Sequence, residues 1–165
     1  MFQRITIATC TLFFIFIVAT TLEAKALSFN ELPVKQTSKQ WSVQVDEAEK
    51  GEDLAKPEKG KFHTYSLKVN NIGKDVSTVE IYLFRNEPNS TTKFSLSGCP
   101  DNHPCRKLDP YKMAISLAKQ LNDGASYQYS NFVLAEKATE LEIEVIWTEN
   151  SEGRPLKERF TFTSD

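Results

Sequence analysis

Two cysteines and a histidine near the middle of the chain are the side chains best suited to chemistry. They lie in the segment CPDNHPC at residues 99–105. In an oxidising compartment an isolated pair this close predicts a disulfide between Cys99 and Cys105, and a loop of this size stabilises a fold by about 2 kcal/mol. The alternative is a metal site formed by Cys99, His103 and Cys105. Zinc sites usually have two to four residues between cysteines and a fourth ligand, and this segment offers neither.

Catalytic groups are scarce elsewhere. Histidine occurs only at His63 and His103, so a Ser-His-Asp or Cys-His arrangement cannot be assembled with confidence. A disulfide would also consume the only thiols that remain after removal of the N-terminal segment. We find no catalytic motif and no cofactor-binding motif. We therefore expect a protein that is not an enzyme and needs no cofactor.

A row of carboxylates near the C-terminus has two interpretations. Glu140, Glu142 and Glu144 alternate along a predicted strand, so adjacent members lie about 7 Å apart on one face. They could form a cation site or a dock for a basic partner. They could instead be a solvated sheet face that Lys157 and Arg159 of the last strand neutralise. We favour the second interpretation, since calcium sites usually cluster aspartates in turns.

Aromatic residues in the second half of the chain could line a binding surface, although core packing explains most aromatics of a small β domain. We combine them with the polar residues of the cysteine loop. The candidate contact surface comprises Asp101, His103, Tyr111, Tyr127 and Tyr129.

The N-terminus has the features of a secretory signal peptide. Arg4 precedes an uncharged apolar run of 17 residues, 5–21, and residues 24–26 read Ala-Lys-Ala, a signal-peptidase pattern. The alternative is an uncleaved anchor, because 17 residues is the short limit for a membrane-spanning helix. We expect residues 1–26 to be a signal peptide, 27–40 an irregular lead-in and 41–165 one domain.

The mature chain of residues 27–165 has 18 basic and 21 acidic residues, a net charge of −3. This balance gives no basic bias towards nucleic acid. No second long apolar segment follows, so we expect a secreted protein with no membrane span after cleavage.

Short alternating segments predict strands between turn-forming residues. They are residues 41–45, 65–69, 76–84, 94–96, 127–134, 141–147 and 160–162. Residues 110–123 favour a helix, with Asp109 as cap, Pro110 at its first position and Gly124 after its end. Met113, Ile115 and Leu117 also alternate, so a strand remains the alternative there.

The last two strands are expected to pair as an antiparallel hairpin in one register, because a slip by one residue would turn an apolar set towards solvent. The expected pairs are Leu141 with Phe162, Ile143 with Phe160, Trp147 with Leu156, and Glu144 with Arg159. Glu158 would fall opposite Val145 on the core face, so it must reach the domain edge or be displaced by a bulge.

The pattern YxLxVNNxG at residues 65–73, followed by VxIxL at 79–83, resembles the front half of bacterial secreted immunoglobulin-like modules. The segment LNDGASY at 121–127 resembles a later turn and strand of such modules. The resemblance implies an all-β protein: an immunoglobulin-like antiparallel β-sandwich of about seven strands, here with one short helix. It implies adhesion, spacing or an accessory role, and it carries no functional residues across.

These observations lead us to expect a secreted, non-enzymatic binding or structural module that recognises an extracellular protein or glycan. The alternatives are a secreted inhibitor or accessory factor that uses the Cys99–Cys105 loop, and a metal-binding protein centred on that loop.

We predict that Cys99 and Cys105 are disulfide-bonded in the exported protein, because they are close and no other mature cysteine is available. Mass spectrometry after alkylation without reduction should find neither thiol modified, and reduction should expose both. Alkylation of both thiols in the folded, unreduced protein would contradict this pairing.

Overall fold

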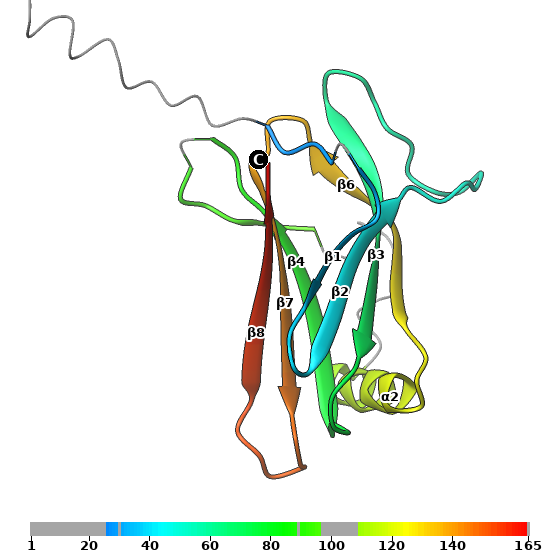
Figure 1. Cartoon of the computed structure of the whole chain (residues 1–165), viewed down its shortest axis with the longest axis vertical. Helices are drawn as coiled ribbons and strands as arrows, with labels where there is room; N and C mark the ends of the chain where they lie inside the picture. Colours follow the sequence, from blue (N-terminus) through cyan, green and yellow to red (C-terminus); the bar gives the residue numbers. More distant parts are fainter. Residues whose placement is uncertain (1–25, 30, 89, 97–108, 165) are drawn as a thin grey trace, which may run out of the picture.

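The structure is a computed structural model, and it describes residues 26–29, 31–88, 90–96 and 109–164. In this part of the chain eight strands form two four-stranded antiparallel sheets that pack face to face (Figure 1). The first sheet has the order β1 (Val34–Thr37), β2 (Trp41–Glu47), β3 (Phe62–Asn71), β6 (Tyr127–Ala135). The second has the order β5 (Phe94–Ser95), β4 (Thr78–Arg85), β7 (Glu140–Thr148), β8 (Leu156–Thr163). The expected all-β sandwich is confirmed.

The core lies between the two sheets and is built by the alternation of the strands, which sends every second side chain inwards. Trp41 of β2 and Trp147 of β7 meet edge to face across the core, with ring centroids 5.6 Å apart. Such an aromatic pair contributes about 0.5–1.5 kcal/mol beyond the area it buries. Leu67 of β3, Phe132 of β6 and Ile143 of β7 are also buried in this layer.

The predicted hairpin register is confirmed residue by residue. β7 and β8 pair without a shift from Glu140 opposite Thr163 to Trp147 opposite Leu156. Glu158 faces Val145 as expected, and no bulge displaces it. It stays partly exposed because β8 is the last strand of its sheet, although its Oε2 atom is buried and has no hydrogen-bond partner among the described residues.

The only helix in the described residues is α2 (Pro110–Asn122), which settles the choice between helix and strand. The Asp109 side chain accepts a hydrogen bond from the Tyr111 amide, Pro110 opens the first turn, and Gly124 follows the end with φ of 83°. Ala114, Ala118 and Leu121 form the buried face. No helix of the described residues is long and apolar enough to cross a membrane.

The expectation of an irregular lead-in over residues 27–40 is wrong for residues 34–37. Residues 34–37 form β1, which pairs with β2, and Gln36 Nε2 donates to the Thr161 carbonyl of β8 (2.7 Å), joining the two sheets. Before β1, the Leu27 amide donates to the Ala138 carbonyl (2.6 Å), and the Leu27 side chain is 1% exposed. An edge strand this short has too few inward residues to show alternation, and the sequence pattern therefore gave no signal.

A buried asparagine fixes the loop of residues 48–61 at the end of the sandwich opposite α2 (Figure 1). Asn131 of β6 has φ of 51°, a left-handed conformation that few residues other than glycine adopt. Its Oδ1 accepts from the Glu49 amide (2.7 Å) and the Ser66 hydroxyl (3.2 Å). Its Nδ2 donates to the carbonyls of Glu49 (3.0 Å) and Ala55 (2.9 Å). The Asn131 side chain thus forms the hydrogen bonds that a neighbouring strand would otherwise form with the backbone of this loop.

Substituting Asn131 should separate the two parts of its role. Asn131→Gly keeps the backbone conformation but loses the four hydrogen bonds, so unfolding should become easier by about 2 kcal/mol. Asn131→Ala should cost about 1 kcal/mol more, since alanine is strained at this φ. Chemical denaturation of both variants measures the difference. An alanine variant as stable as the glycine variant would show that the conformation carries no strain.

Candidate functional site

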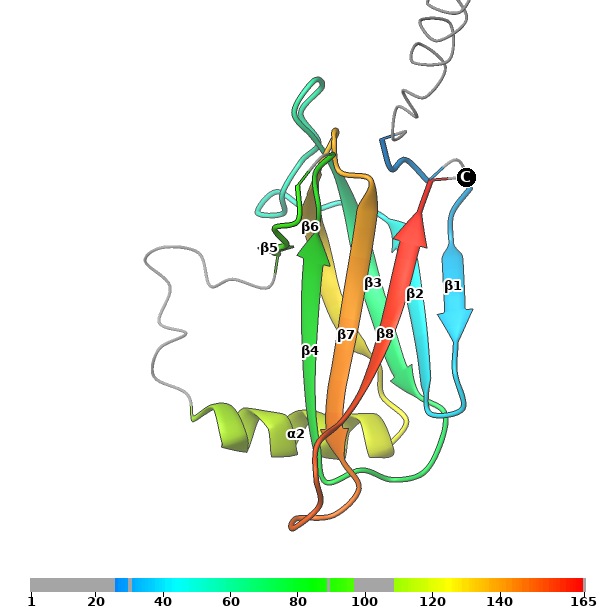
Figure 2. The same ribbon diagram turned by 90° about the vertical axis from the view of Figure 1, so that its left-hand side faces the viewer.

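A helix covers the open edge of the second sheet. β5 is two residues long and pairs only with Phe84 and Arg85, so the rest of β4 has no strand on this side in the described chain. α2 lies crosswise beside this stretch of β4 (Figure 2). The Asn122 side chain ties it there, because its Nδ2 donates to the Val76 carbonyl (2.9 Å) and its Oδ1 accepts from the Val76 amide (3.1 Å). The helix is therefore fixed at the point where β4 begins.

An open groove of about 460 Å³ remains between α2 and β4. Its apolar lining comes from both elements and from the first residue of β6. The principal apolar residues are Ile81, Met113, Ala114, Leu117 and Tyr127, and the polar ones are Glu80, Tyr82, Ser116 and Gln120. Met113 is 51% exposed, which is unusual for a large apolar side chain beside a core helix. The groove is therefore an accessible apolar surface.

The backbone of β4 presents hydrogen-bonding groups to this groove. Backbone groups of successive residues in a strand point to opposite edges. The Leu83 carbonyl accepts from the Leu96 amide (2.8 Å) on the β5 side, whereas the Asn86 amide donates to the Glu140 carbonyl (3.3 Å) on the β7 side. Ile81 has the parity of Leu83 in a ladder without a register shift. Its N–H and C=O therefore point away from β7, towards the groove.

One carboxylate stands at the groove. Glu80 is exposed and accepts a hydrogen bond from the Tyr82 hydroxyl. This hydrogen bond, together with burial, raises the pKa of Tyr82 above its ordinary value of 10.0. No ion pair found among the described residues includes Glu80. The groove is thus an apolar site with a negative charge that no lysine or arginine of the described chain neutralises.

The structure brings only part of the predicted contact surface to this groove. Tyr127 lines it, and burial followed by the nearby Tyr129 raises the pKa of Tyr127. Tyr129 packs against the core and donates from its hydroxyl to the Leu96 carbonyl (3.2 Å). Tyr111 is 57% exposed on the first turn of α2 and is not part of the lining.

The remaining predicted site residues, Cys99, Asp101, His103 and Cys105, lie outside the described residues, so the predicted disulfide and the alternative metal site remain predictions. Within the described chain, no group of three or more histidine, cysteine, aspartate or glutamate residues is arranged to hold a metal ion.

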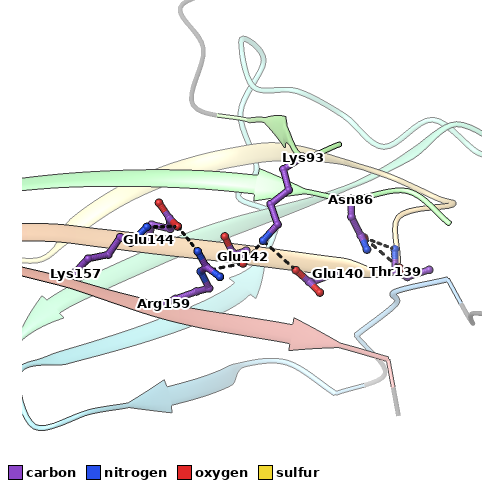
Figure 3. A network of polar contacts seen from close by, with 8 residues as sticks. All are labelled: Asn86, Lys93, Thr139, Glu140, Glu142, Glu144, Lys157 and Arg159. Atoms are coloured by element: carbon purple, nitrogen blue, oxygen red, sulfur yellow. Dashed lines mark hydrogen bonds and ion pairs between the residues drawn. The ribbon is translucent and has the colours of Figure 1, made fainter. Parts of the chain in front are cut away.

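The acidic row on β7 is neutralised by basic neighbours, as the favoured interpretation predicted, but it is not solvated throughout, because Glu142 is buried (Figure 3). Arg159 contacts Glu142 (3.1 Å) and Glu144 (2.8 Å), and Lys157 contacts Glu144 (3.0 Å). Lys93, from the segment before β5, pairs with Glu142 and lies 3.6 Å from Glu140. Positive and negative groups alternate along this face, and Lys93 also fastens its own segment to the sheet.

Apart from Tyr127, sequence reasoning identified none of the groove residues as a site, and it missed Lys93. Met113 and Ile115 were noticed only because they alternate, which kept a strand possible for residues 110–123. In a helix these two residues fall outside the buried face, so they are surplus apolar residues and a signal of an exposed surface. Lys93 offers no comparable signal, because nothing local to it indicates a contact with residues 47 and 49 positions away.

The chain is similar to one family of proteins, which is described as secreted. The family described as YozF-like secreted protein matches residues 25–165, a range that starts beside the predicted cleavage site and includes every described helix and strand. The uncharacterized protein YozF of Bacillus subtilis (strain 168) is 47% identical over 144 residues, which cover 87% of this chain and 86% of that protein. No solved structure matches.

The ion pairs of β7 predict a loss of stability in acid. Burial acts to raise the pKa of Glu144, but hydrogen bonds from Arg159 and Lys157 outweigh it and hold this pKa below 4.5. A carboxyl whose pKa is lower in the folded state stabilises the fold above its unfolded pKa, and this stability is lost as pH falls through the folded pKa. Glu144→Gln should therefore lower the free energy of unfolding at pH 7 by about 1 kcal/mol, and by less at pH 3.

Denaturant titrations at both pH values measure this effect, with Glu152→Gln as the control. Glu152 is exposed in the turn between β7 and β8 and takes part in none of the ion pairs described above. A Glu144→Gln penalty that does not change between pH 7 and pH 3 would contradict the assignment.

Proposed function

The chain belongs to the YozF-like secreted protein family, and from this premise we propose that it is a non-enzymatic binding module whose groove between α2 and β4 holds a segment of an extracellular protein. The observation that carries the proposal is the accessible apolar groove itself. Its walls come from elements that the core and the Asn122–Val76 hydrogen bonds hold in place, so the groove exists without a ligand. Preformed apolar grooves with a few polar groups are typical binding sites.

The outer part of the groove supports a macromolecular partner. Met113 lies in the lining and is 51% exposed, so a bound segment can cover it from outside. Exposed apolar surface of this kind commonly marks an interaction site. Tyr111 and Ile115 are also exposed on α2, but they lie on the other side of the helix and take no part in the groove.

The lining favours a protein over a glycan. Ile81, Met113 and Leu117 are aliphatic or thioether side chains, and Tyr127 is the aromatic ring that joins them in the lining, with Tyr82 on the polar side. Sugars need many hydrogen-bonding groups in a site, because each hydroxyl loses water on binding. The few polar side chains come from both walls, Glu80 and Tyr82 from β4 and Ser116 and Gln120 from α2, and the apolar residues outnumber them. This lining suits a protein segment that inserts an apolar side chain.

The proposal extends to the fold family, which we assign as immunoglobulin-like. In that arrangement strands A, B and E share one sheet, and C′, C, F and G share the other. Taking β2, β3 and β6 as A, B and E, and β5, β4, β7 and β8 as C′, C, F and G, reproduces both strand orders. β1 is then an added strand beyond A, and α2 stands in the chain where strand D would be, between C′ and E, although it packs mainly against β4. This correspondence supports a module whose exposed edges serve recognition.

Photo-cross-linking in the cells that secrete the protein tests the proposal. A benzoylphenylalanine at position 116, in the groove wall, should give a discrete adduct with another protein. The same group at position 52, exposed in the loop at the other end of the sandwich, should not.

A second substitution shows whether the adduct depends on the groove. Adding Met113→Glu, which places a charge in the groove at a half-exposed position, should abolish the adduct and leave the circular dichroism spectrum unchanged. An adduct that survives Met113→Glu, or equal adducts from positions 116 and 52, would refute the proposal.

A further inference from the structure

We infer that the groove accepts an extended peptide segment that pairs with the backbone of Ile81, inserts an apolar side chain against Met113 and Leu117, and sets an adjacent lysine or arginine beside Glu80. This inference rests on the proposed function and states the chemistry of the partner segment. Three features of the groove support it: the strand edge, the alternation of side chains along β4, and the unneutralised carboxylate.

The open edge of β4 selects an extended backbone. The N–H and C=O of Ile81 point into the groove, and within residues 26–29, 31–88, 90–96 and 109–164 no strand pairs with them. A segment that lies along β4 can form the hydrogen bonds that β5 would form with β4 if it were longer. Strand addition of this kind gives affinity through the main chain and specificity through alternate side chains.

The alternation of β4 determines which side chains of the segment face the protein. Ile81 points towards the core side of its sheet, whereas Glu80 and Tyr82 point to the outer face. A residue paired opposite Ile81 therefore directs its side chain to the apolar side of the groove, between β4 and α2. The residue next to it in the segment directs its side chain to the outer face, beside Glu80. The segment must carry an apolar residue adjacent to the one that meets the carboxylate.

The charge at the outer face selects a basic residue. On the neighbouring strand β7, Glu140, Glu142 and Glu144 all have lysine or arginine partners, but Glu80 takes part in none of these ion pairs. The two lysines of α2, Lys112 and Lys119, are not part of the groove lining. An exposed ion pair contributes up to about fivefold in affinity. The apolar side chain and the backbone hydrogen bonds thus provide most of the affinity, and the carboxylate adds a preference for a basic residue.

The experiment uses a phage-displayed library of random dodecapeptides selected on the mature secreted protein and counter-selected on the Met113→Glu variant. Selected peptides should contain an aliphatic or aromatic residue next to lysine or arginine. Fluorescence polarisation with the synthetic peptides then measures the dissociation constant for each variant.

Glu80→Gln should weaken these peptides about two- to fivefold. Glu152→Gln, at an exposed position remote in sequence from the groove lining, should not change their affinity. Replacing the basic residue of the peptide by norleucine should remove the difference between wild type and Glu80→Gln. Methylation of the peptide nitrogen at the inserted apolar residue should weaken binding tenfold or more, because it removes a strand hydrogen bond.

Several outcomes overturn the inference. Peptides that depend on Met113 but show no basic preference, or that bind equally to Glu80→Gln or after nitrogen methylation, would refute the partner chemistry and leave the groove a protein-binding site. A library that yields no peptide weakened by Met113→Glu would also refute it. The cross-link from position 116 tests the proposed function separately, so the two failures are distinguishable.

Discussion

The open edge of β4 is the constraint on which the arrangement at this end of the molecule depends. β4 lies inside its sheet by strand order, yet β5 pairs with only two of its residues, so among the described residues most of one edge lacks a strand. Unpaired strand edges invite aggregation, and proteins cover them with other elements. α2 covers this one, and Asn122 secures it by forming with Val76 the two hydrogen bonds that a neighbouring backbone would form. A helix cannot extend a sheet, so covering the edge leaves a groove beside it.

The elements that the sequence predicted well carry their information locally. The register of the β7–β8 hairpin could be predicted because apolar and polar residues alternate in both strands. Only one pairing keeps both apolar sets on one face. The helix could be placed because its cap, its first proline and its terminal glycine lie within sixteen residues of one another. β1 and β5 were harder. β1 was missed because an edge strand of four residues has no measurable period, and β5 is reduced to two residues that pair only with β4.

The candidate site was largely invisible to the sequence for a different reason. The groove brings residues 79–82 beside residues 110–120, and no local pattern states that these two segments meet. Tyr127 was selected as an aromatic residue without knowledge of its neighbours. The acidic row was interpreted correctly because both of its predicted partners lie on the adjacent hairpin strand, whereas Lys93 reaches it from another part of the chain. Contacts between adjacent hairpin strands could therefore be predicted from the sequence, whereas contacts between segments distant in the chain could not.

If the chain is cut after Ala26 as predicted, the burial of Leu27 determines the order of cleavage and folding during export. With the predicted cut after Ala26, the scissile bond lies directly before a residue whose amide donates to the Ala138 carbonyl and whose side chain is inside the core. Proteases act on chain that has opened locally, and they cannot reach a bond whose neighbour is docked in this way. Signal peptidase must therefore release the chain before the N-terminal segment closes onto the sandwich. A mutant that folds faster than it is processed would retain its leader and stay tethered to the translocation machinery.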